Sequence, residues 1–106
     1  MRIVLFLITI SLLHVSCGRL KTDKGLNSAA YDGDVEKVKL LIENGHDVNG
    51  KGWDGDTPLA NAIREEHPKI VELLLSNGAS IENEFVRDAI HECKNQKIID
   101  LIEHHY

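Results

Sequence analysis

Residues 26–50 and 59–83 are two copies of one pattern, set 33 positions apart. Each copy holds two short apolar stretches joined by a turn, too little to bury its own apolar side. Units of this size are stable only when neighbouring copies stack and share one core. The pairs that match at this spacing are Leu26 with Leu59, Ala29 with Ala62, Val38 with Val71, Leu40 with Leu73, Leu41 with Leu74, Gly45 with Gly78 and Val48 with Ile81.

The second copy carries clear signs of two helices. Thr57 followed by Pro58 is typical of a helix start, because the hydroxyl caps a free N–H and proline fits the first turn. The second helix is predicted to begin at Pro68 and to end near Gly78, since glycine past a helix end adopts the left-handed conformation freely. Its wide apolar face is formed by Ile70, Val71, Leu73, Leu74 and Leu75.

A third, reduced unit follows. Ala89 lies 27 positions after Ala62, six fewer than the period, and the missing residues fall before Phe85. The second junction is therefore predicted to lack the long turn of the first, as is common in a terminal capping unit. Its two predicted helices carry Phe85, Val86, Ala89 and Ile90, then Ile98, Ile99, Leu101 and Ile102.

The period of 33 and the motif "TPLANA" at residues 57–62 resemble the ankyrin repeat. The resemblance implies an all-α fold: an ankyrin-repeat solenoid of about three helix-turn-helix units with one β-hairpin-like finger. The domain would span 25–106, with repeats at about 25–50, 51–83 and 84–106. Two residues depart from the family pattern. Ala60 replaces the usual histidine, which removes an inter-repeat hydrogen bond, and Glu66 replaces a glycine.

The single tryptophan, Trp53, lies in the glycine- and aspartate-rich finger predicted between Asp47 and Asp56. In the family this position faces outward on the concave binding surface. Tryptophan, tyrosine and arginine are enriched among interface hot spots. The alternative is that Trp53 folds onto its own finger or onto the aliphatic part of Lys51. The resemblance implies a partner-binding surface formed by Tyr31, Asp32, Lys51, Trp53, Asp54, Asp56, Arg64, Glu65, His91 and Glu92.

The first 17 residues have the pattern of a signal peptide. Arg2 precedes an apolar run, Ile3 to Leu13, which is too short for a comfortable membrane span. The following "LLHVSCG" resembles the lipobox of bacterial lipoproteins, although His14 replaces its usual apolar residue. We expect Cys17 to become a lipidated N-terminus, 18–24 to form a tether, and the protein to face the periplasm or cell surface. The alternative is cleavage after Gly18, which gives a soluble periplasmic or secreted protein.

The net charge of −5, which becomes −6 without Arg2, and the absence of a basic cluster exclude nucleic acid as the expected partner. The sequence holds no phosphate-binding glycine loop and no nucleophile motif. We therefore expect a non-enzymatic, monomeric protein without cofactors whose partner is another protein.

A second hypothesis is a periplasmic metal-binding protein that uses His91, Cys93, His104 and His105. These residues lack the usual spacing of zinc ligand pairs, so solvated histidines are the preferred interpretation. Cys93 is expected to be a packed thiol if Cys17 is acylated. If Cys17 stays free, a disulfide with Cys93 becomes possible in an oxidising compartment.

Overall fold

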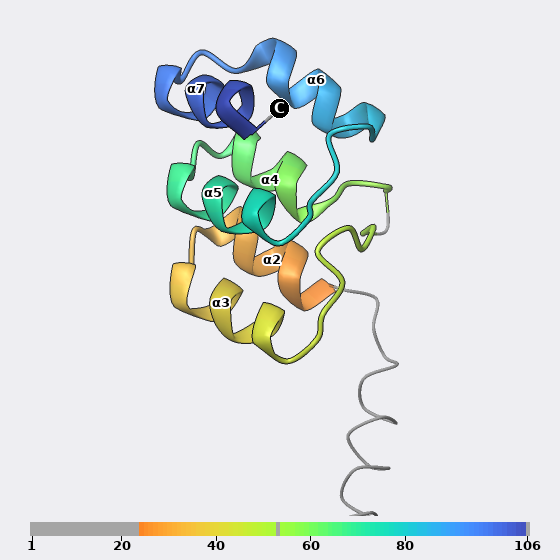
Figure 1. The fold of residues 1–106 in the computed structure, drawn as a ribbon. Helices are drawn as coiled ribbons and strands as arrows, with labels where there is room; N and C mark the ends of the chain where they lie inside the picture. The colour runs from red at the N-terminus through yellow and green to blue at the C-terminus, as the bar shows by residue number, and fades with distance from the viewer. Residues whose placement is uncertain (1–23, 53, 106) are drawn as a thin grey trace, which may run out of the picture.

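The computed structural model describes residues 24–52 and 54–105, which form six helices and no strand. The helices follow one another in three pairs, stacked from α2 and α3 at one end to α6 and α7 at the other (Figure 1). This arrangement confirms the predicted all-α stack of three helix-turn-helix units. The helices are α2 (Lys24–Asp32), α3 (Val35–Glu43), α4 (Pro58–Arg64), α5 (Pro68–Ser76), α6 (Glu84–Glu92) and α7 (Gln96–His105).

The units stack in two layers. The first helices pack in the order α2, α4, α6, and the second helices in the order α3, α5, α7. One continuous core runs between the layers, with equivalent residues repeated from unit to unit. Leu26, Leu59 and Val86 occupy the same core position on the three first helices, and each is fully buried. Within the described residues, no helix is both long and apolar enough to cross a membrane.

Local capping chemistry sets the helix ends where the sequence predicted them. The Thr57 hydroxyl accepts a hydrogen bond from the Ala60 N–H at 3.4 Å, and Pro58 occupies the first turn of α4. In the first unit Asp34 caps α3 in the same way, accepting from Lys37 N–H at 3.1 Å. Gly78 follows α5 with φ +91°, the left-handed conformation expected just past a helix end.

Leu40 is an exception to the shared core that the sequence predicts. Its equivalent, Leu73, faces α3, but Leu40 itself is 55% exposed. The reason is its place in the stack, because α3 lies in the first described unit and no described unit covers that side. Lys37 is likewise exposed where Ile70, 33 positions later, is fully buried. Within the described residues, this side of α3 therefore exposes both polar and apolar side chains.

Asparagine side chains link the first two units. Asn27 Nδ2 donates to the Gly50 carbonyl at 3.0 Å, and Asn61 Nδ2 donates to Asn27 Oδ1 at 3.0 Å. The loss of the histidine at Ala60 was expected to cost an inter-repeat hydrogen bond, and the neighbouring Asn61 makes such a bond instead. Asn49 adds a second link, donating to the Gly78 carbonyl at 3.2 Å and accepting from Ser80 N–H at 2.7 Å.

Between equivalent core positions on its two helices the third unit has one residue more than the second, whereas the segments between the helices, 65–67 and 93–95, are equally long. Ala89 lies 27 positions after Ala62, but Ile98 lies 28 positions after Ile70. The second unit turns through Glu66, a left-handed residue with φ +55°, whereas Cys93 caps α6 in an extended conformation. α6 packs on α4 and α7 on α5, while α6 and α7 are not a closely packed pair.

Candidate functional site

In the described part of the predicted finger, Gly52 and residues 54–56 form a tight turn. Gly52 N–H donates to the Asp56 carbonyl at 2.7 Å, and Gly55 N–H donates to the Gly52 carbonyl at 3.2 Å. Gly55 has φ +93°, and a Cβ added there would lie 2.7 Å from Cε2 of Phe85 on α6. The turn thus rests against the third unit. Trp53, the residue that led us to this surface, lies outside the described residues.

An ion pair ties this turn to two helices. Arg64 Nη1 on α4 lies 2.9 Å from Asp56 Oδ2, and Arg64 Nη2 donates to the Phe85 carbonyl at 3.5 Å. The pair is partly exposed, so we expect it to stabilise the fold by about 1 kcal/mol at most. Asp56 Oδ1 is buried and accepts no hydrogen bond from the described residues. The predicted site residues Arg64 and Asp56 therefore bind each other as well as facing the surface.

A groove of 340 Å³ lies between α2, α4 and the turn. We call it the α2–turn groove. It brings together three of the predicted site residues, Tyr31, Asp54 and Asp56. Tyr31 is 55% exposed, and the Asp54 carboxylate is also exposed. The residues that line the groove are Asn27, Ser28, Tyr31, Gly52, Asp54, Asp56 and Asn61.

The backbone beneath Tyr31 is held by the second unit. His67 precedes α5 and makes no side-chain cap; its Nε2 lies 3.1 Å from the Tyr31 carbonyl and donates to it. The imidazole ring covers Gly33, where an added Cβ would come within 2.6 Å of it. The end of α2 is thus fixed against the start of α5. This contact holds the backbone of Tyr31 in place, while the Tyr31 ring stays exposed.

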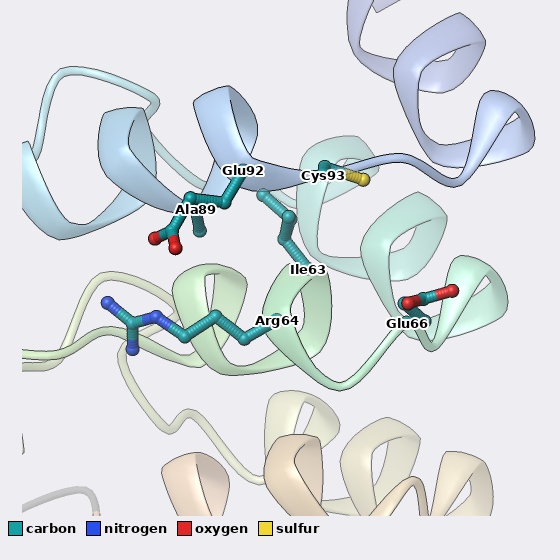
Figure 2. Close-up of a pocket in the computed structure, with 6 residues that line it drawn as sticks. All are labelled: Ile63, Arg64, Glu66, Ala89, Glu92 and Cys93. Atoms are coloured by element: carbon teal, nitrogen blue, oxygen red, sulfur yellow. The ribbon is translucent and has the colours of Figure 1, made fainter.

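A second, smaller hollow of 160 Å³ lies between α4 and α6 and holds two predicted residues, Arg64 and Glu92. Their side chains extend toward one end of the hollow, and Glu66 and Cys93 lie at the other end (Figure 2). Ile63 and Ala89 form its floor where α4 and α6 pack. Cys93, the residue that caps α6 in an extended conformation, is one of its lining residues.

The other predicted residues are spread more widely. Lys51 lines a separate groove of 300 Å³ with Glu82 and Asn83, beside the shorter junction between α5 and α6. Asp32 ends α2, Glu65 caps α4 and His91 lies in the last turn of α6, all three exposed. The nine predicted residues that the structure describes therefore do not form one continuous pocket.

Four residues of the α2–turn groove were not predicted: Asn27, Ser28, Gly52 and Asn61. The sequence held a usable clue for two of them. Ser28 and Asn61 are 33 positions apart, and each lies three residues, about one helical turn, before a predicted site residue, Tyr31 or Arg64. Extending the repeat alignment by one helical turn along the exposed face would have included both.

The proposed metal ligands do not converge. Residues 24–52 and 54–105 contain no group of three or more histidine, cysteine, aspartate or glutamate side chains arranged to hold a metal. His104 Nδ1 lies 2.8 Å from the Asp100 carbonyl, its own helix backbone. Cys93 is half-buried, with Sγ 3.8 Å from the Asn95 carbonyl, and His91 is exposed on α6. The metal-binding hypothesis therefore has no support from this part of the chain.

Comparison with known proteins gives the same result as the fold. A family model described as ankyrin repeats (3 copies) matches residues 2–85. A probable E3 ubiquitin-protein ligase of Oryza sativa subsp. japonica is 40% identical over 67 residues, 59% of this chain and 13% of that protein. A 2-5A-dependent ribonuclease of Mus musculus is 42% identical over 64 residues, 57% of this chain and 8% of that protein.

An ankyrin repeat domain-containing protein, oryK of Aspergillus oryzae, is 39% identical over 51 residues, 48% of this chain and 8% of its own length. The chain thus spans only a small part of each of these relatives, and the similarity to them is at the level of the repeats. The family model covers most of the sequence, and the three stacked helix pairs agree with it. The chain belongs to the ankyrin-repeat family.

Proposed function

We propose that this chain binds another protein through the α2–turn groove and the adjoining exposed ends of α2, α4 and α6. Ankyrin repeats are in general non-enzymatic protein–protein interaction modules, and this chain belongs to that family. The observation that carries the proposal is the groove itself, which is lined by an exposed tyrosine of α2 and two aspartates of the turn. Aromatic side chains on a rigid support are frequent anchors of protein interfaces.

The role of this surface can be tested with photo-crosslinking. A crosslinking amino acid at Ser28, exposed beside the groove, should capture the partner from an extract of the source cells. The same amino acid at Glu72, exposed on α5 in the other layer, is the matched control and should not. Equal crosslinking from both positions would argue against the proposed surface.

Trp53→Ala tests the tryptophan separately. The substitution should leave the helical circular dichroism unchanged and weaken partner binding by about tenfold, the loss of a moderate interface hot spot. Surface plasmon resonance with the crosslinked partner, once it is identified by mass spectrometry, gives the measurement. Unchanged affinity would remove Trp53 from the interface while leaving the crosslinking result to decide the surface.

We also propose that the protein is exported and held at a membrane through an acylated Cys17. The support is the sequence of residues 1–17, with Arg2 before an apolar run and a lipobox-like "LLHVSC". Mass spectrometry of the mature protein should show a chain that begins at Cys17 and carries acyl groups. Cys17→Ser should move the protein from the membrane fraction to the soluble fraction. An unmodified chain that begins after Gly18 would contradict the anchor and support a soluble exported form.

A further inference from the structure

The α2–turn groove is rich in hydrogen-bond acceptors and carries no positive charge in its lining. Its charged lining residues are Asp54 and Asp56, with no lysine, arginine or histidine among them. Arg64 reaches Asp56 at Oδ2 only, and Asp56 Oδ1 is buried without a hydrogen bond. A ligand for this groove must therefore supply donors and positive charge.

Asn61 adds an acceptor whose orientation the hydrogen bonds determine. Asn27 Nδ2 donates to the Gly50 carbonyl, so its Oδ1 is left to accept from Asn61 Nδ2 at 3.0 Å. Asn61 Oδ1 then accepts no hydrogen bond from the described residues, although Asn61 is half-buried and lines the groove. Half-buried acceptors without partners are favourable points for a ligand that only donates.

The remaining wall is the exposed ring of Tyr31. An aromatic face beside carboxylates suits a cation that can stack, because the ring quadrupole attracts positive charge. Guanidinium is planar, weakly hydrated and has five donors, so it can stack on an aromatic ring and bind several acceptors at once. The chain already places one guanidinium, that of Arg64, against the Asp56 carboxylate at 2.9 Å.

We propose that the α2–turn groove is a socket for an arginine side chain of the partner protein. The guanidinium stacks on Tyr31 and donates to the Asp54 carboxylate and to Asn61 Oδ1. Asp56 also lines the groove, where Arg64 already balances its charge, so Asp54 supplies the charge for the ligand. This inference deepens the proposed function and rests on it, since it specifies the chemistry of the segment that the groove binds.

Amide chemical shifts of the isotope-labelled protein, titrated with N-acetyl-arginine amide, test the socket directly. The expected result is a saturable shift at Tyr31, Gly52, Asp54 and Asn61. N-acetyl-citrulline amide, which has nearly the same shape but no charge, should leave these amides unchanged. N-acetyl-lysine amide should bind more weakly than the arginine compound, because ammonium cannot form the planar stack.

Two substitutions and one control sharpen the test. Asp54→Asn should weaken arginine binding by about two- to fivefold, the size of one exposed charge pair. Tyr31→Ala should weaken it by about two- to fivefold, the size of an exposed cation–π contact. Glu103→Gln removes one exposed acid from α7, outside the groove, and should leave the affinity unchanged.

Equal shifts with citrulline, or equal losses with Glu103→Gln and Asp54→Asn, would overturn the socket. The crosslinking experiment separates this failure from failure of the proposed function. If Ser28 crosslinks to a partner and the arginine compound does not bind, the groove is an interface without an arginine socket. If neither occurs, both the interface and the socket are wrong.

Discussion

At the scale of single residues, Gly55 combines two constraints, a left-handed backbone and a crowded Cβ position, of which Gly45 meets only the first. Its φ of +93° is unfavourable for any residue with a Cβ, as is the φ of +91° at Gly45. A Cβ at Gly55 would also lie 2.7 Å from the Phe85 ring, whereas a Cβ at Gly45 would meet nothing within 4 Å. Comparing the two positions therefore separates backbone strain from crowding.

Gly55→Ala should destabilise the protein more than Gly45→Ala does. We expect Gly45→Ala to cost about 1 kcal/mol, the strain of a left-handed alanine. Gly55→Ala should cost at least about 1 kcal/mol more, because a tightly packed aromatic ring must move. Urea unfolding followed by circular dichroism measures both changes.

The Phe85→Ala background provides the decisive comparison for this prediction. With the ring removed, the extra cost at Gly55 should disappear and the two glycine substitutions should become equal. An undiminished difference in that background would mean that contact with Phe85 is not what restricts Gly55.

At the scale of elements, the sequence predicted what local chemistry determines. Thr57 with Pro58 and Gly78 each mark a helix boundary through a bond or conformation within a few residues, and α4 and α5 begin and end accordingly. The stacking followed from the 33-residue period. The exposure of Leu40 did not follow from the period. The period makes Leu40 and Leu73 equivalent, although the two residues have different neighbours.

The candidate site was harder to predict for a physical reason. Its geometry depends on contacts between units, such as Arg64 with Asp56 and the Phe85 carbonyl. Such contacts depend on the rotation between neighbouring units, and the sequence of a single repeat does not determine this rotation. The family resemblance placed Tyr31 and Asp54 on the correct surface, but it also included Lys51, which lines a different groove. The extra residue between the core positions of α6 and α7 is visible only when both helices are aligned separately.

At the scale of the whole molecule, the described stack is linear, and each unit is stabilised by contact with its neighbours. α4 packs on both α2 and α6, and α5 packs on both α3 and α7. The middle unit therefore holds both end units in place, whereas the third unit touches only one neighbour. Total stability of so small a core is expected to be a few kcal/mol, so the loss of one central contact is a large fraction of it.

Leu74→Ala and Ile98→Ala should consequently differ in how far their effects spread, although both side chains are fully buried. Each truncation removes about 2–5 kcal/mol locally. In amide hydrogen exchange, Leu74→Ala should lower protection in all six helices, because both end units depend on α5 and its partner α4. Ile98→Ala should lower it mainly in α7, with a smaller loss in α6, because α6 packs chiefly on α4. Leu40→Ala, at a half-exposed position, is the control and should change stability by less than about 0.5 kcal/mol. The opposite outcome would be that Ile98→Ala removes protection from α2 and α3 as strongly as from α7. The three units would then unfold as one, and the stability of the stack could not be treated as a sum over units and their interfaces.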